Sequence, residues 1–399
     1  MSIYMIRIFF LYLLGCAILF SYSPIISYSS NYIIYGIIFI LILLNIKEYF
    51  RILFNNIPII FILIILMGFH LIYFIIYNNI SFSEIRSIVI SFFVFLLFFS
   101  NNIEERRMHS IIYHHSIITI ILSVGIIAFY YNGNLIEAVL NTGIYFYPEK
   151  NSFSPLLLVS LIYIIYRLFY YRFNIYSLIF LFIGAISLIV IQSRTAILSF
   201  LVSGLLLLLI KMNRIWNSLI GIIINLSMFC LIIVFTAYSE WFNNLISLLF
   251  RFDYIQYANY SNFTDNLTSG RLISIKVAYE NFMKNPLFGT SFRVEHIIND
   301  PISKAGVHNM WLRTLFYGGI FYFIILILFI FLLLKNYTVN LKYNHLIYAL
   351  LVGALIMSLG EPFAPFGPGT SYFLLWLVMG LLLQVKNLRK QSSLVEKVL

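Results

Sequence analysis

The sequence predicts an all-α integral membrane protein with about twelve transmembrane helices. Hydrophobic residues make up 62% of its 399 positions and charged residues only 10%, whereas a soluble domain has roughly 45–50% apolar and about 25% charged residues. Apolar runs of about 17–25 residues recur along the whole chain, and such a run is long enough to cross the hydrocarbon core of a bilayer. The runs lack the alternation of barrel strands, so helices, which satisfy their own backbone groups in lipid, are expected.

Twelve apolar runs define the expected spans, and a large loop separates the ninth from the tenth. The chain therefore divides into nine helices at 1–238, an extracytoplasmic loop with amphipathic helices at 239–309, and three helices with a cytoplasmic tail at 310–399. The predicted spans are 5–24, 31–46, 57–77, 86–101, 111–131, 152–170, 175–192, 195–211, 215–238, 310–334, 345–360 and 371–385.

The positive charges predict the orientation of these spans. With both termini on one side, that side holds 15 of the 25 Lys and Arg residues, the long loop holds six, and the short loops and helix ends opposite hold four. Short cytoplasmic loops are enriched in Lys and Arg, while long loops translocate regardless of charge. Both termini are therefore expected in the cytoplasm. The net charge is +11, but the basic residues do not cluster as nucleic-acid binding requires, so no nucleic-acid partner is expected.

Arg194 lies between two apolar runs that leave almost no room for a loop. The segment Gln192-Ser193-Arg194-Thr195 should form a tight helical hairpin that holds Arg194 at the outer membrane boundary. A charge at the rim of a membrane helix is costly, which makes this arginine a candidate for function. The alternative is an interfacial arginine that reaches lipid phosphates.

The outer loop holds a second arginine at a predicted helix start. Ser269 can cap a helix with apolar residues at helical spacing, and Asn285-Pro286 should end it. Free N–H groups at a helix start bind anions, and Arg271 in the first turn would complete a phosphate site because a guanidinium holds phosphate oxygens in a bidentate way. A salt bridge to Asp265 is the alternative.

His308 and Asn309 precede the tenth expected span. A neutral histidine at the outer boundary can act as a general base near pH 7, and Asn309 could orient it or a substrate hydroxyl. The alternative is a structural histidine. Glu361, also expected on the outer face, could be a secondary carboxylate or could simply end a helix.

Motifs of several other enzyme classes are missing from the sequence. There is no GxxxxGKS loop for ATP hydrolysis, and no Asp-x-Asp motif of a metal-dependent nucleotide-sugar transferase. Cys16 and Cys230 both lie inside predicted spans, which makes a disulfide framework or a Cys-based metal site implausible. We therefore expect no cofactor and no metal.

Taken together, the motifs resemble those of the O-antigen polymerase and ligase superfamily of bacterial membrane glycosyltransferases. Their order and spacing over about 185–385 carry the resemblance, and the first 150 residues match only in hydropathy. The matching features, in chain order, are Ser193-Arg194, Ser269-Gly270-Arg271, NPLFGTSF at 285–292, His308-Asn309 followed by Gly319 and Tyr322, and FLLWLVMG at 373–380.

The resemblance implies a metal-independent glycosyltransferase with a GT-C-like helical fold, acting on undecaprenyl-diphosphate-linked glycans at the outer face of the inner membrane. By matching position, Arg194 and Arg271 would hold the donor diphosphate, and His308 would take the proton of the acceptor hydroxyl. Arginines suit this role because the departing lipid diphosphate develops negative charge. A chain-length regulator protein is a further candidate partner. The predicted substrate-binding residues are Arg194, Arg271, Asn309, Ser269, Arg293 and Glu361.

The motifs are common to both branches of the superfamily, a polymerase that extends a lipid-linked glycan and a ligase that transfers the glycan to lipid A-core. The outer loop has six basic and six acidic residues, whereas a surface that docks a heavily phosphorylated core should be net basic. This balance favours a polymerase. A polysaccharide flippase is a further alternative, but transporters usually have pseudo-symmetric halves and a mid-membrane site, while here the halves differ and the polar candidates lie at the outer rim.

Overall fold

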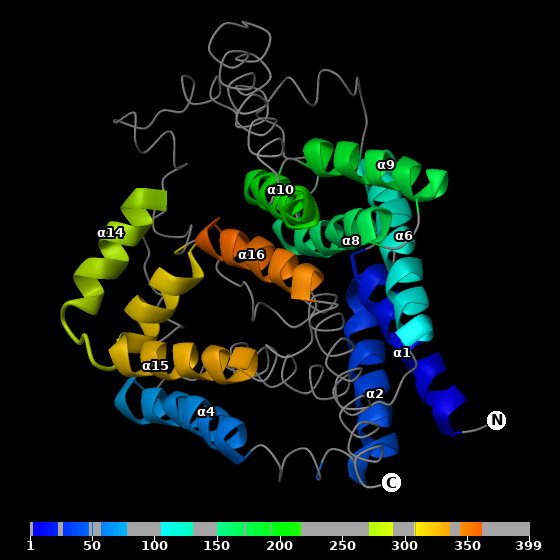
Figure 1. Cartoon of the computed structure of the whole chain (residues 1–399). Coiled ribbons are helices and arrows are strands. Elements are labelled where there is room, and N and C mark those ends of the chain that lie inside the picture. Colours follow the sequence, from blue (N-terminus) through cyan, green and yellow to red (C-terminus); the bar gives the residue numbers. More distant parts are fainter. Residues whose placement is uncertain are drawn as a thin grey trace, which may run out of the picture.

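The structure, a computed structural model, is a bundle of α-helices over the part of the chain that it describes (Figure 1). Within that part every regular element is a helix. The described residues are 3–22, 27–47, 50, 57–77, 105–130, 150–170, 173–191, 193–216, 271–289, 307, 309–335 and 344–360.

Nine of the twelve expected spans coincide with described helices, and a tenth described helix, α14, lies between the ninth and tenth expected spans, where a helix was predicted. The expected spans at 86–101 and 371–385, and all but the first two residues of the span at 215–238, lie outside the described residues. The helices are α1 (Ile3–Phe20), α2 (Ser27–Leu44), α4 (Ile57–Tyr77), α6 (Glu105–Tyr130), α8 (Lys150–Tyr170), α9 (Ile175–Ile191), α10 (Arg194–Trp216), α14 (Arg271–Phe282), α15 (Met310–Lys335) and α16 (Asn344–Gly360).

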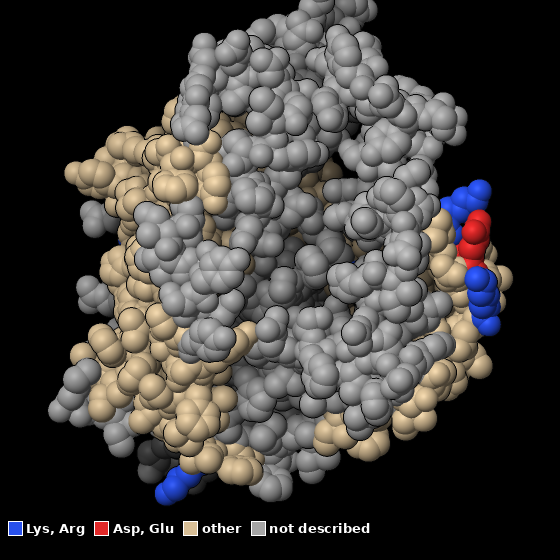
Figure 2. Space-filling model, turned by 180° about the vertical axis from the view of Figure 1, so that it is seen from behind, with Lys and Arg blue, Asp and Glu red and all other residues tan. Residues whose placement is uncertain are grey.

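The described helices have the length and surface of membrane helices. Three of them, at 109–130, 153–170 and 310–328, are long and apolar enough to cross a membrane, and five shorter apolar helices accompany them. Large apolar side chains such as Phe61 and Phe182 are more than 60% exposed, and Figure 2 shows few charged side chains on the described surface. Such an apolar exterior suits lipid rather than water. These features support an all-helical membrane protein, while the number of twelve spans stays a prediction.

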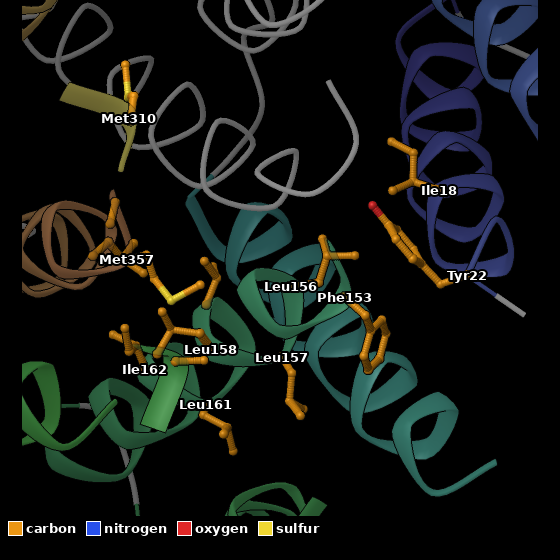
Figure 3. Packing of buried hydrophobic residues seen from close by; sticks show 14 of the residues in the cluster. Ile18, Tyr22, Phe153, Leu156, Leu157, Leu158, Leu161, Ile162, Met310 and Met357 are labelled. Atoms are coloured by element: carbon orange, nitrogen blue, oxygen red, sulfur yellow. The ribbon is translucent and has the colours of Figure 1, made fainter. Parts of the chain in front are cut away.

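Helix α8 forms the centre of the bundle, since all side chains from Phe153 to Tyr166 are buried. Leu161 packs over Gly184 of α9, and Leu158 and Ile162 pack against Gly353 of α16. Figure 3 shows Leu158 and Ile162 beside Met357, one turn further along α16. Glycine at these crossings brings the helix backbones close together, as is common in membrane bundles.

The contacts of Tyr170 show how these helices are oriented. At the C-terminal end of α8, its hydroxyl donates a hydrogen bond to the carbonyl of Leu207 (3.3 Å), and its ring stacks on His345 at the start of α16 with centroids 5.3 Å apart. Helix α10 therefore runs parallel to α8, while α16 runs antiparallel to both. The starts of α8 and α10 and the end of α16 consequently lie at one end of the bundle.

Candidate functional site

Arg194 is the first residue of α10, directly after the short connection that follows the end of α9 at Ile191. This confirms the tight helical hairpin expected at this point. The carbonyl of Ser193 accepts a 3.0 Å hydrogen bond from the Ile197 N–H, so Ser193 is the N-cap residue. The free N–H groups and partial positive charge of a helix start favour an anion at this position.

Arg271 is likewise the first residue of its helix, α14. The helix ends at Phe282 and a turn over 283–289 follows, which confirms that Asn285-Pro286 ends it. Phe282 and Tyr279 pack on Phe316 of α15, with ring centroids 5.5 and 5.9 Å apart. The two helices run in the same direction, and their starts lie on the same side (Figure 1).

Asn309 caps the start of α15 and ties it to the end of α16. Its side-chain oxygen accepts a 3.0 Å hydrogen bond from the Leu312 N–H, and its side-chain nitrogen donates one of 3.1 Å to the Leu359 carbonyl. Trp311 adds a second link, since its indole N–H donates to the Ser358 hydroxyl at 2.7 Å. Both polar atoms of the Asn309 amide are therefore bound to protein groups, which fix the chain directly after His308.

These contacts bring four helix ends to one end of the bundle. The start of α10 lies beside the end of α16, the end of α16 is bound to the start of α15, and the start of α14 lies on the same side as that of α15. The backbones of Arg194, Arg271 and Asn309, which are far apart in sequence, therefore lie at the same end of the bundle. Two helix starts that each begin with an arginine can together attract a group with more than one negative charge, such as a diphosphate.

The turn after α14 docks into a break in α15. Gly319 has φ 76° and ψ 173°, so α15 consists of two segments at an angle. The N–H groups of Ile320 and Phe321 donate to the carbonyls of Pro286 and Leu287, at 3.0 and 3.3 Å, instead of to carbonyls of their own helix. The end of α14 is thus fixed to the helix that follows His308.

Two glycines make this close approach of backbones feasible. Gly289 has φ 65°, and a Cβ on it would lie 2.5 Å from the carbonyl oxygen of Tyr317 and 2.6 Å from the nitrogen of Gly319. Any other residue would clash there and would also be strained by the positive φ. The NPLFG sequence and Gly319, which carried part of the resemblance, therefore meet in one joint.

Residues 178–327 match the family model described as O-antigen ligase. This match supports the resemblance of the chain to the O-antigen polymerase and ligase superfamily. The match starts within α9 and ends within α15, so it contains Arg194, Arg271, Arg293, His308 and Asn309. A match to this family model suggests a function of the O-antigen ligase or polymerase type, in lipopolysaccharide biosynthesis. No curated protein matches the chain.

The structure describes only part of the predicted site. The backbones of Arg194 and Arg271 are described but their side chains are not, and four further predicted residues lie outside the described residues. Among the described residues, no group of three or more His, Cys, Asp and Glu side chains could hold a metal ion. The four predicted site residues outside the description are His308, Ser269, Arg293 and Glu361.

Two buried serines at the same end escaped the sequence reasoning. The hydroxyls of Ser193, before α10, and Ser154, in the first turn of α8, are buried and have no hydrogen-bond partner. Both serines lie at the end of the bundle where α8 and α10 begin. No motif distinguishes Ser154, because serines are frequent in this chain's helices and only the packing shows which ones lack a partner.

Proposed function

We propose that this chain is an O-antigen polymerase, which transfers an undecaprenyl-diphosphate-linked glycan onto another lipid-linked glycan at the periplasmic face of the inner membrane. The observation that carries the proposal is that the arginine-led starts of α10 and α14 and the start of α15 lie at one end of the bundle, in a segment that matches the O-antigen ligase family model. Both termini then lie in the cytoplasm, and a chain-length regulator protein is a candidate partner.

In this proposal Arg194 and Arg271 bind the diphosphate of the donor. The acceptor hydroxyl oxygen attacks the anomeric carbon, the bond from that carbon to the diphosphate oxygen breaks, and undecaprenyl diphosphate leaves. Guanidinium groups fixed at two helix starts stabilise the charge that develops on the leaving group, and this stabilisation needs no metal ion.

His308 accepts the proton that the acceptor hydroxyl loses as it attacks. Asn309 supports this role by holding the chain after His308, through its bonds to Leu312 and Leu359. If Asn309 also binds substrate, the substrate has to replace the bond to the Leu359 carbonyl, which is the one that does not cap the helix. Ser269, Arg293 and Glu361 complete the proposed substrate-binding set.

A ligase is the second candidate, because the matching family model is itself described as O-antigen ligase. The two activities differ in the acceptor, which is a lipid-linked glycan for a polymerase and lipid A-core for a ligase. The equal numbers of acidic and basic residues in the outer loop favour the lipid-linked acceptor, since a phosphorylated core would require a basic surface.

Deletion of the gene separates the two candidates. Lipopolysaccharide from the deletion strain is resolved on a gel, and lipid-linked glycans are extracted in parallel. If the protein is a polymerase, the deletion strain should make core that carries a single repeat unit, without a ladder of longer chains. Bare core, together with long glycans that accumulate on the lipid carrier, would identify a ligase instead. A normal ladder would contradict both.

A further inference from the structure

Helix α4 contributes one polar side chain to the break in α15. The hydroxyl of Tyr73 donates a 2.6 Å hydrogen bond to the carbonyl oxygen of Gly318, and Tyr73 is only 1% exposed. Its ring forms a cluster with those of Phe69 and Tyr322, at centroid distances of 6.3 and 6.4 Å, and these two rings are themselves 5.8 Å apart. Helix α4 precedes the segment that matches the family model, so this contact comes from outside the matched domain.

The bond satisfies a backbone group that the break releases. In an unbroken helix the Gly318 carbonyl would accept from the N–H four residues later, and the N–H groups of Ile320 and Phe321 would donate to carbonyls four residues earlier. At the break, carbonyls of the turn after α14 accept hydrogen bonds from these two N–H groups, and the Tyr73 hydroxyl donates one to the Gly318 carbonyl. Buried backbone groups need partners, so these three bonds together favour the broken form over a straight helix.

The break determines where the start of α15 lies. The first segment of α15, from Met310 to Gly318, is about 13 Å long at 1.5 Å per residue. A change of about 5° at the break therefore moves Asn309, and His308 before it, by about 1 Å. A displacement of this size in a catalytic group can lower a rate by about 100-fold.

We propose that Tyr73 is a positioning residue for glycan transfer, which holds the break in α15 and thereby the place of His308 relative to the starts of α10 and α14. This role rests on the proposed function, in which His308 is the general base. Tyr73 does not contact substrate; it acts through the carbonyl of Gly318 and the first segment of α15.

The test compares Tyr73→Phe with Tyr170→Phe in the full-length protein reconstituted in nanodiscs. Phenylalanine keeps the ring that packs against Phe69 and Tyr322 and removes only the hydroxyl. Tyr170 is a matched control because its hydroxyl also donates to a backbone carbonyl, that of Leu207, but at the opposite end of α8 from the site. Gel filtration confirms that both variants are folded and monodisperse.

Two readouts are measured on each variant. The first is hydrogen exchange at the amides of Ile320 and Phe321, which reports the break itself. The second is glycan transfer, with lipid-linked glycan extracted from a strain that lacks this gene as the probe. We expect Tyr73→Phe to accelerate exchange at both amides and to lower kcat about 10- to 100-fold. KM for the donor should change less than about twofold, because the proposed donor-binding arginines begin two other helices, α10 and α14. Tyr170→Phe should match the wild type in both readouts.

Other results overturn the proposal. Faster exchange with wild-type kcat would show that the Tyr73 bond is structural only, and unchanged exchange would show that the bond does not hold the break. A rise in KM alone would move Tyr73 to donor binding. If the wild-type protein itself transfers no glycan, the proposed function fails and the role of Tyr73 in transfer fails with it, whereas the exchange data still report the break independently.

Discussion

At the scale of single residues, the proposed glycan transfer depends on two arginines that begin helices and on one histidine. Removal of either guanidinium leaves the leaving diphosphate with less charge stabilisation, so Arg194→Ala and Arg271→Ala should each reduce glycan transfer by about 10²- to 10³-fold while the protein still inserts into the membrane. Arg167→Ala is the control, since Arg167 lies over the ring of Tyr113, at 3.5 Å from its centroid, near the opposite end of α8. Transfer is measured as ladder formation in a deletion strain that expresses each variant at matched levels. Wild-type ladders from the two arginine variants would rule out their assigned role.

His308 should be separable from the arginines by binding. His308→Ala removes the base but leaves the two proposed diphosphate-binding residues in place, so turnover should be lost while the affinity for undecaprenyl diphosphate stays within about threefold of the wild type. Binding is measured by fluorescence or calorimetry on the protein in nanodiscs, with Arg271→Ala as the variant that should lose affinity. Retained turnover in His308→Ala would exclude His308 as the base.

The sequence identified residue types at the site better than it identified their contacts. It predicted Arg194 in a tight hairpin between two spans, because polar residues interrupt the apolar run there, and Arg271 in the first turn of a helix that Ser269 can cap. It missed the double role of the Asn309 amide, whose bond to Leu359 joins residues 50 positions apart. It also missed Tyr73, which looks like any other aromatic residue of an apolar run. Contacts between distant segments depend on packing and leave no local pattern.

At the scale of elements, the break in α15 should tolerate no side chain. Gly319→Ala places a Cβ against the backbone of Leu287 and Gly289 and imposes a positive φ on a residue with a side chain, which should destabilise the fold by about 1–3 kcal/mol and lower the midpoint of thermal unfolding in detergent. Gly125→Ala is the matched control, because nothing lies within 4 Å of a Cβ on Gly125 in α6. This control should leave stability unchanged or raise it by about 0.5–1 kcal/mol. Equal stability of the two variants would contradict the joint.

Helix ends were predicted well where polar residues flank an apolar run, and the break was not predicted at all. The expected span 57–77 coincides with α4 (Ile57–Tyr77), and α9 and α16 end within one residue of the prediction. The sequence from Met310 to Lys335 reads as one continuous apolar helix, and a pair of glycines inside such a run is common. The break exists because the turn at 285–289 supplies hydrogen-bond acceptors, and only the tertiary structure brings that turn to Gly319.

At the scale of the whole molecule, the orientation in the membrane can be tested with cysteines. In a background with Cys16 and Cys230 replaced by serine, Glu280→Cys on the exposed face of α14 and Lys211→Cys in α10 are both accessible positions. Figure 2 shows charged side chains at the edge where α14 lies. A membrane-impermeant maleimide should label position 280 once the outer membrane is opened, and position 211 only after the inner membrane is permeabilised. The reverse labelling would place the site on the cytoplasmic side and would contradict the proposed function.

The central claim is that this chain by itself transfers a glycan from a lipid diphosphate. The most direct measurement uses the purified protein in liposomes with lipid-linked glycan extracted from a strain that lacks this gene, and follows free undecaprenyl diphosphate together with glycan length. We predict that lipid diphosphate is released in step with the appearance of longer lipid-linked chains, and that neither product forms with His308→Ala. Wild-type protein that releases no lipid diphosphate and leaves the glycan length unchanged, with or without added lipid A-core as acceptor, would contradict the account.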